Sequence, residues 1–177
     1  DYFKAHPRFC SEFGFQSFPS MEVAEAFASR GQILSHGPDF EWHQKHPSGN
    51  RLVRKMLAEN FRPPKDVPSE LLLSQFQQVQ ALKTAIEDWR AHRPYCMGIL
   101  YWQLNDNWPV SGWSSIEYGA SGPDGSVASK WKPAHYAVRR LYAPQAAARA
   151  LKAADGLRPA RLDIAQTALV DLDDARR

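Results

Sequence analysis

The sequence predicts an α/β fold in which a long helix joins two parallel strands, the arrangement of neighbouring strands in a (β/α) barrel. Two apolar runs, residues 7–13 and 96–103, have the length of strands, and each gives way to polar and aromatic side chains. Between them lies a stretch with continuous helical periodicity. Barrel enzymes carry their chemistry at the carboxyl ends of the strands, so the side chains that follow the two runs are the candidate functional groups.

The first strand leads into a short helix and then a loop. The strand rises to Glu12 and is broken by Gly14. Ser20 is a good N-cap and predicts a short helix over residues 21–29. Residues 31–49 contain a Gly-Pro, a His-Pro and a Ser-Gly pair, and these breakers predict a loop.

Two helices are expected between this loop and the second strand. One covers residues 50–60 and is stopped by a Pro-Pro pair. The other is the clearest in the sequence, opened by Ser69 and ended by Pro94. Its apolar residues recur at spacings of three and four, which predicts a buried stripe made of Leu72, Phe76, Val79, Leu82, Ile86 and Trp89. Its other faces are expected to carry polar residues that include Gln75, Gln77 and Gln78.

The amino-acid composition changes twice in the carboxyl-terminal part of the chain. Residues 120–129 are small and polar and predict an exposed loop. A helix is expected from Lys132 or Pro133 through residue 141, since proline is favoured in a first helical turn. Residues 145–177 are rich in alanine, arginine and aspartate and poor in aromatic residues, so we expect a tail of poorly defined structure after a domain formed by residues 1–144.

Composition narrows the classes of function. Of 177 residues, 44% are apolar and 12% aromatic, which indicates a globular domain, and no apolar run is long enough to span a membrane. The net charge of +3 comes from scattered lysines and arginines, so no nucleic-acid partner is expected. Cys10 and Cys96 are expected to be buried thiols rather than a disulfide. The histidines show no metal-ligand spacing, so no metal site is expected.

The strand ends carry the candidate chemistry. Glu12 could act as a nucleophile, a general base or a metal ligand, or it could be a structural ion-pair partner of Arg8. After the second strand, Trp102 and Trp108 stand among polar side chains that include Asn105 and Asp106. Aromatic faces stack on sugar rings, and amides and carboxylates bond sugar hydroxyls, so this group is typical of a carbohydrate site. The tryptophans could instead simply anchor loops.

The exact order of residues in these segments is also informative. Residues 7–20 read Pro-Arg-Phe-Cys-Ser-Glu-Phe-Gly-Phe-Gln-Ser-Phe-Pro-Ser, and shorter runs follow at 43–45, 49–50, 93–98, 100–106, 108–110, 130–132 and 135–136. In these runs and their order, residues 1–144 resemble the β-mannosidases of glycoside hydrolase family 2. The resemblance implies a retaining exo-enzyme that releases terminal β-D-mannose from β-mannosides and manno-oligosaccharides, without a cofactor. It also implies that Glu12 is the nucleophile on the seventh strand of a (β/α)8 TIM barrel, and that Trp102 ends the eighth strand and lines the sugar site.

The same resemblance predicts a fragment. Retaining hydrolysis needs two carboxyl groups about 5–5.5 Å apart. In this family the acid/base glutamate follows an asparagine on the fourth strand, and no Asn-Glu pair precedes Glu12. The chain is therefore expected to be a partial barrel, the last two strands and their helices, whose partner is the rest of the same catalytic chain. It would carry the nucleophile and lack the acid/base, and Asp106 is not expected to replace it.

Two alternatives stay open. In one, the chain is a non-catalytic carbohydrate-binding fragment, with Trp102 and Trp108 as the binding surfaces and Glu12 as a hydrogen-bond acceptor. In the other, the chemistry is the same but the sugar differs, as in a β-galactosidase or β-glucuronidase. Labelling of Glu12 by a mechanism-based fluorosugar distinguishes an enzyme from a binding fragment.

Overall fold

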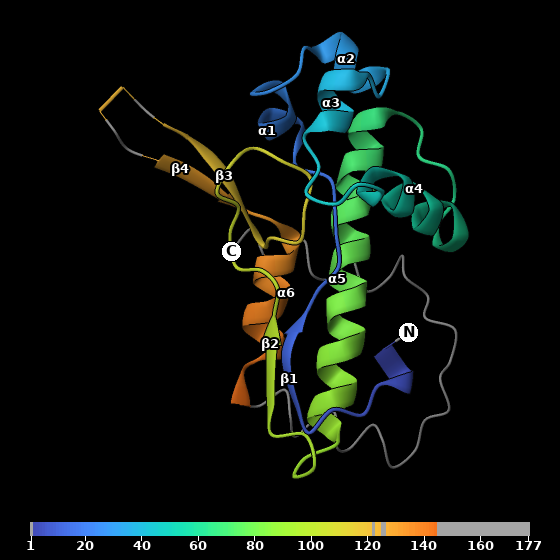
Figure 1. Ribbon diagram of the computed structural model, residues 1–177, viewed down its shortest axis with the longest axis vertical. Coiled ribbons are helices and arrows are strands. Elements are labelled where there is room, and N and C mark those ends of the chain that lie inside the picture. Colours follow the sequence, from blue (N-terminus) through green and yellow to red (C-terminus); the bar gives the residue numbers. More distant parts are fainter. Residues whose placement is uncertain (1, 122, 125–126, 145–177) are drawn as a thin grey trace.

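A computed structural model describes residues 2–121, 123–124 and 127–144, which form two small sheets and a set of helices around one long helix (Figure 1). In chain order the elements are η1 (Tyr2–Lys4), β1 (Phe9–Phe13), α1 (Met21–Glu25), α2 (Arg30–Leu34), α3 (Pro38–Trp42), α4 (Gly49–Asn60), α5 (Val67–Ala91), β2 (Gly98–Tyr101), β3 (Ile116–Ser121), β4 (Val127–Trp131) and α6 (Pro133–Leu141). Mixed helices and strands confirm the α/β class.

The two strands that the sequence predicts lie side by side and run parallel. Phe9 of β1 pairs with Gly98 of β2, and Phe13 pairs with Tyr101 beyond an irregularity in the register. Both arrows in Figure 1 point toward the half of the molecule that contains α1, α2 and α3. The carboxyl ends of β1 and β2, with the loops that follow, therefore meet at one place.

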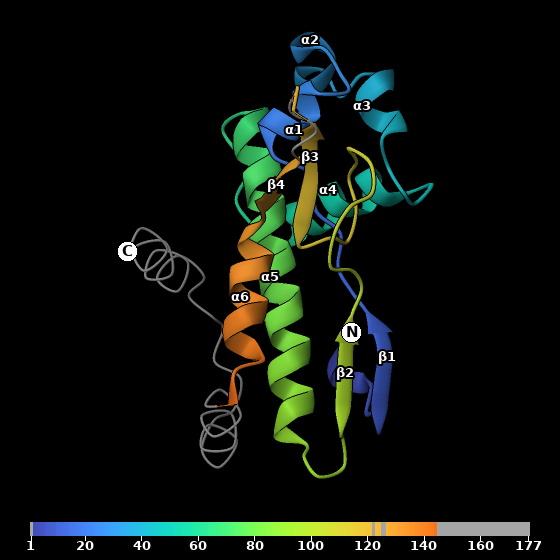
Figure 2. The same ribbon diagram turned by 90° about the vertical axis from the view of Figure 1, so that its left-hand side faces the viewer.

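Helices α5 and α6 cover one face of this strand pair, as Figure 2 shows. Apolar side chains from both helices and both strands fill the space between them: Phe13, Leu82, Ala85, Ile86, Trp89, Cys96, Ile99, Ala134 and Val138. Trp89 adds apolar area to this core, and two contacts fix the orientation of its ring. The ring meets Phe13 edge-on at 5.0 Å, and the indole N–H donates to the Ala5 carbonyl at 2.9 Å. Cys10 and Cys96 are free thiols, as expected; Cys96 is buried in this core, whereas Cys10 is only partly buried against it.

A second core lies at the other end of α5. It is formed by Phe18, Ala24, Ala28, Ile33, Phe40, Val53, Leu57 and Leu71, which come from α1 to α5 and the loop after β1. The prediction of a loop over residues 31–49 is wrong, because this stretch overlaps α2 and contains α3. Both helices are only five residues long, and they are stabilised by burying Ile33 and Phe40 completely rather than by a periodic pattern.

Helix α5 departs from its predicted face in its first half. The helix begins earlier than expected, with the Asp66 carboxylate, not Ser69, as the cap. Leu82, Ile86 and Trp89 are buried as predicted, but Leu72 is exposed. The side chains buried in its place are mainly polar and include all three glutamines that the pattern placed elsewhere: Leu71, Ser74, Gln75, Gln77 and Gln78.

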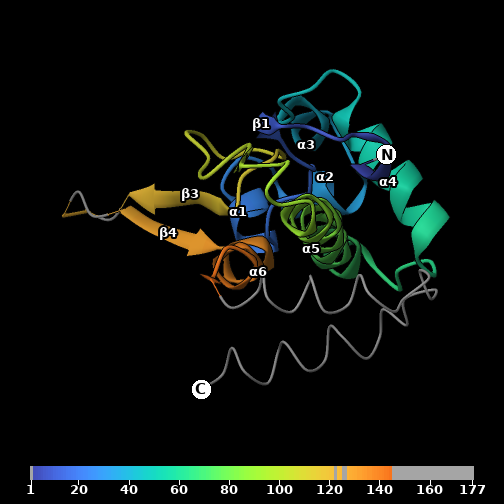
Figure 3. The same cartoon turned by 90° about the horizontal axis from the view of Figure 1, so that it is seen from below.

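The stretch predicted as an exposed loop, residues 120–129, largely belongs to a hairpin. Strands β3 and β4 pair antiparallel, with Ile116 opposite Trp131 and Glu117 opposite Lys130, and extend away from the helices (Figure 3). Small residues gave no periodic signal there, and pairing between the two arms supplies the order. Helix α6 follows as predicted, with Pro133 in its first turn and with Ala137 and Val138 buried. The predicted tail, residues 145–177, lies outside the described residues.

Candidate active site

Glu12 stands near the carboxyl end of β1 with an exposed side chain. Among the described residues its carboxylate has no hydrogen-bond or ion-pair partner, which disfavours the structural pair with Arg8. The Arg8 guanidinium instead lies 5.2 Å from the centre of the Tyr95 ring. A carboxylate at a strand end that makes no bond within the fold is available to react or to bind.

Trp102 is brought next to this strand end by backbone contacts. Its N–H donates to the Phe13 carbonyl at 2.6 Å, directly after Glu12. Gly14 makes this approach possible, because a Cβ there would overlap the Trp102 carbonyl oxygen and press against the Trp113 ring. The Trp102–Gln103 peptide is cis, and the Trp102 side chain is 47% exposed. The structure thus places Glu12 and Trp102 on adjacent strand ends.

Tyr2 supports the same strand end from the other side. Its hydroxyl donates to the Gly14 carbonyl at 2.6 Å, and its ring meets both Phe13 and Trp89 edge-on. Burial raises the Tyr2 pKa to about 12, with a smaller contribution from Cys10. The tyrosine therefore stays neutral and keeps donating its hydrogen bond across the physiological pH range.

Asp106 is buried in a network of protein groups. One of its oxygens accepts from Lys45 Nζ at 2.8 Å, and the other accepts from the Ser114 hydroxyl. Asn105 is exposed next to it and donates to the Asp106 carbonyl at 3.1 Å. Both oxygens of the aspartate are thus engaged within the fold, while the neighbouring amide keeps acceptor capacity toward solvent.

Trp108 lies with a different set of aromatic rings. Its ring is tilted against His43 at 5.1 Å and perpendicular to Trp42 at 6.1 Å. His43 is itself fixed, because Nδ1 bonds the Pro109 carbonyl at 2.6 Å and the ring stacks on Phe27 at 4.0 Å. The structure therefore groups Trp108 with the α3 end, whereas Trp102 belongs with Glu12.

Sequence reasoning gave no role to Lys132, which lies at the centre of the buried polar network. The residue is 1% exposed, and its Nζ donates to Ser17 Oγ at 3.1 Å. Burial lowers the Lys132 pKa, while the charges of Asp106 and Glu117 act in the opposite direction. One signal was present in the sequence: a lysine occupies the N-cap position before Pro133, where serine, threonine or aspartate is usual.

Two buried glutamines of α5, Gln75 and Gln78, hold the loop that follows β1. Gln78 Nε2 donates to the carbonyls of Phe15, Trp113 and Ser114 at 2.9, 3.0 and 3.2 Å, and its oxygen accepts from Ser17 at 3.0 Å. A loop cannot pair its backbone in a sheet, so the side-chain amide supplies the missing donor. This side chain joins the loops after β1 and β2 to one helix.

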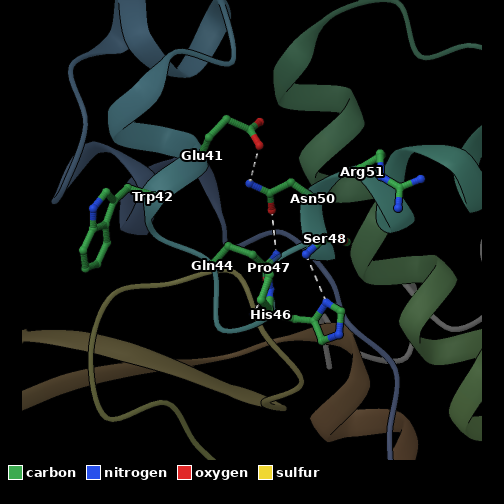
Figure 4. A pocket seen from close by; sticks show the side chains of 8 residues that line it. All are labelled: Glu41, Trp42, Gln44, His46, Pro47, Ser48, Asn50 and Arg51. Atoms are coloured by element: carbon green, nitrogen blue, oxygen red, sulfur yellow. Dashed lines mark hydrogen bonds between the residues drawn. The ribbon is translucent and has the colours of Figure 1, made fainter.

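A pocket of about 490 Å³ opens between α3 and α4. Figure 4 shows its lining side chains, with Trp42 and Arg51 on opposite sides of the hydrogen bond that joins Gln44 to Asn50. We refer to it as the α3–α4 pocket, lined by Glu41, Trp42, Gln44, His46, Pro47, Ser48, Asn50 and Arg51. It is tied to the loop after β1 by Gln16, whose Nε2 donates to Gln44 Oε1 at 2.7 Å.

Two kinds of feature are absent from the described residues. In the part of the chain that the structure describes, no cluster of three or more histidine, cysteine or acidic side chains is arranged to hold a metal ion. Within that same part, no helix combines the length and apolar character needed to cross a bilayer.

Comparison with known proteins supplies the family. No protein-family model matches the chain. The β-mannosidase of Capra hircus is 36% identical over 151 residues, and β-mannosidase B of Aspergillus niger is 33% identical over 145 residues. The crystal structure of the β-D-mannosidase of Dictyoglomus thermophilum superimposes with a TM-score of 0.69 at 34% identity, covering 80% of this chain. The chain is a relative of the β-mannosidases.

The match to the β-mannosidases covers most of this chain and a small part of theirs. Alignment with the Capra hircus enzyme includes 77% of the chain but 16% of the relative, and the Dictyoglomus thermophilum structure is likewise covered to 16%. The chain thus spans only 16% of the length of the β-mannosidases that it matches.

Proposed function

We propose that residues 1–144 are the carboxyl-terminal part of the catalytic barrel of a retaining β-mannosidase of glycoside hydrolase family 2, with Glu12 as its nucleophile. The observation that carries the proposal is the pairing of an unbonded, exposed carboxylate on β1 with a half-exposed tryptophan, Trp102, on the neighbouring strand end. The names of the relatives favour β-mannosides over other β-glycosides.

In the proposed reaction a Glu12 oxygen attacks the anomeric carbon while the glycosidic C–O bond breaks. The leaving oxygen takes a proton from a second carboxyl group, and the sugar stays on Glu12 as an ester. Water, deprotonated by that second group, then attacks the anomeric carbon and frees mannose and Glu12. Trp102 would face the sugar ring, and Asn105 would bond a hydroxyl. Trp108 would bind farther out.

The second carboxyl group is expected from the rest of the catalytic chain. Asp106 is the nearest candidate in the sequence after β2, but its oxygens accept from Lys45 and Ser114. This argues for a role of Asp106 in shaping the sugar site through those bonds rather than in proton transfer. We therefore expect the isolated chain to bind β-mannosides without turning them over.

The test uses a chimera in which this chain replaces the corresponding 16% of the Dictyoglomus thermophilum β-D-mannosidase. Incubation with 2-deoxy-2-fluoro-β-D-mannosyl fluoride should add one fluorosugar to the peptide that contains Glu12, detected by mass spectrometry. Glu12→Gln should abolish labelling and reduce hydrolysis of an aryl β-mannoside by about 10³-fold or more. Glu25→Gln, which changes an exposed carboxylate on α1, is the control and should keep full activity.

A non-catalytic sugar-binding role is the second candidate. It is favoured by one observation: of the two carboxylates that the sequence placed near the strand ends, Glu12 alone is free of internal bonds. In that case the chimera would bind mannosides but carry no label. Turnover that persists in Glu12→Gln would eliminate the nucleophile assignment.

A further inference from the structure

We propose that the α3–α4 pocket binds a sugar ring of an oligosaccharide beyond the terminal one that Glu12 would attack. The choice of a sugar as ligand rests on the proposed function, while the existence and position of the site rest on the pocket itself. Its volume of about 490 Å³ lies within the range of small-molecule sites. None of the residues that line the pocket belongs to either hydrophobic core.

The pocket is linked to the nucleophile strand by short, direct contacts. Gln16 bonds Gln44 in the pocket wall and follows Glu12 by four residues, a backbone reach of at most about 14 Å. On the other side, His46 of the pocket meets the Trp113 ring at 6.4 Å, and Trp113 lies against Gly14. An oligosaccharide of a few residues spans such a separation.

Trp42 gives the pocket an aromatic surface. Its side chain is 74% exposed, more than any other large apolar side chain in the described residues. It is not an isolated surface residue, because the rings of Trp108 and His43 hold it at 6.1 Å each. An exposed indole fixed by neighbouring rings is suited to stack on the C–H face of a sugar, as the ring loses little freedom on binding.

Between Trp42 and Arg51 the wall of the pocket is polar and already ordered (Figure 4). Gln44 Nε2 donates to Asn50 Oδ1 at 2.6 Å, and Asn50 Nδ2 donates to Glu41 at 3.1 Å. Asn50 is 2% exposed, and a Cβ at Gly49 would overlap the Gln44 amide, so the glycine leaves room for this wall. These bonds hold the polar atoms in one arrangement before any ligand arrives.

Several donors at the rim remain open. His46 Nδ1 accepts from the Ser48 N–H at 3.2 Å, so in the neutral ring Nε2 carries the proton and can donate. Among the described residues, the Ser48 hydroxyl and the Arg51 guanidinium have no bonding partner. One carboxylate and one guanidinium line the pocket, which favours a neutral ligand rich in hydroxyl groups over a phosphate or another anion.

The first experiment titrates the 177-residue chain with β-1,4-mannobiose and with mannose, followed by ¹⁵N–¹H correlation spectra. We expect mannobiose to bind about tenfold more tightly than mannose and to shift the indole signal of Trp42. Trp42→Ala should weaken mannobiose binding about tenfold and leave mannose binding unchanged. Trp131→Ala is the matched control, since that 46% exposed tryptophan packs on His135 and Tyr136 instead.

The outcomes separate this inference from the proposed function. Equal affinities of the Trp42→Ala and Trp131→Ala chains for mannobiose would overturn the inference, as would displacement of the sugar by inorganic phosphate or no binding at all by a folded chain. Fluorosugar labelling of Glu12 in the chimera would then still support the nucleophile. Binding that depends on Trp42, with no label on Glu12, would leave the pocket standing and remove the enzyme assignment.

Discussion

Lys132 Nζ lies 3.1 Å from Ser17 Oγ, although 115 positions separate the two residues along the chain. The bond ties the start of α6 to the loop after β1, and Ser17 in turn bonds Gln78 on α5. The backbone of Ser17 also pairs with Gly112, so the loops after β1 and β2 share these attachments. Four distant segments of the chain are joined at this one lysine and serine.

Removing the Lys132 ammonium should be costly. We expect Lys132→Met to lower the free energy of unfolding by about 3 kcal/mol, because Ser17 loses a buried donor and Glu117 loses a nearby cation. Chemical denaturation measures the change. Lys130→Met is the control: its ion pair with Glu22 is solvent-exposed, so the loss should stay under about 1 kcal/mol. Similar losses in the two variants would contradict the central role of Lys132.

Gly14 should be intolerant of any side chain. Gly14→Ala places a Cβ against the Trp102 carbonyl oxygen, which is backbone and cannot swing aside. We expect a loss of roughly 2 kcal/mol or more in the free energy of unfolding, and a shifted Trp102 indole signal. Gly31→Ala meets nothing within 4 Å on α2 and should be neutral or stabilising. An unchanged Trp102 signal in Gly14→Ala would show that the strand ends do not touch as described.

The adjacent glutamines of α5 should respond in opposite ways. Gln78→Leu leaves three carbonyls and the Ser17 hydroxyl without their partner, so we expect a loss of about 3 kcal/mol in the free energy of unfolding. Gln77 is buried too, yet neither atom of its amide is bonded among the described residues. Gln77→Leu should therefore be neutral or stabilising by up to about 1 kcal/mol. Equal losses in Gln77→Leu and Gln78→Leu would mean that burial of the glutamine, not its hydrogen bonds, determines the change in the free energy of unfolding.

Tyr2 should make stability depend on pH in the alkaline range. Its pKa in the folded chain is raised to about 12, against about 10 in the unfolded chain. Below pH 10 both states hold the proton and the contribution is complete. Between pH 10 and 12 the unfolded state releases its proton first, so the contribution of Tyr2 to the free energy of unfolding falls as pH rises.

The Tyr2 variant gives a measurable slope. In urea titrations from pH 9 to 12, Tyr2→Phe should make the fall of the free energy of unfolding with pH less steep. The change in slope should correspond to at most one proton per molecule. The decline should not vanish, because burial also raises the pKa of Tyr142 to about 12. A wild-type slope in Tyr2→Phe would refute the assignment to Tyr2.

The sequence predicted the parts of the fold that depend on local periodicity. β1, β2, the second half of α5 and α6 carry apolar residues at the spacing of their own secondary structure, and all were found. The first half of α5 was misjudged because periodicity assumes that polar residues face water. There Gln75 and Gln78 are buried because they bond loop backbone at residues 57 and 63 positions away, which no local pattern reveals. The arms of the β3–β4 hairpin carry too few apolar residues to signal strands.

The site was predictable where it follows a strand. Glu12 and Trp102 lie at neighbouring strand ends because the parallel order fixes them there, and their roles remain predictions. The α3–α4 pocket was not foreseen, because the loop predicted over residues 31–49 gives no positions for Trp42 or Gln44. Asp106 was expected among the polar side chains of the carbohydrate site, and only the fold shows that Lys45 approaches it from the loop after α3.

Helix α5 extends over 25 residues and is shared by both cores, one at each end. The strand pair and the group of short helices consequently have no separate scaffold of their own. Damage to either core is transmitted along a single rigid rod to the other, so we expect the described part of the chain to melt in one cooperative step. Deleting α5 would separate β1 from the helices that line the α3–α4 pocket, so this helix sets the distance between the two proposed subsites.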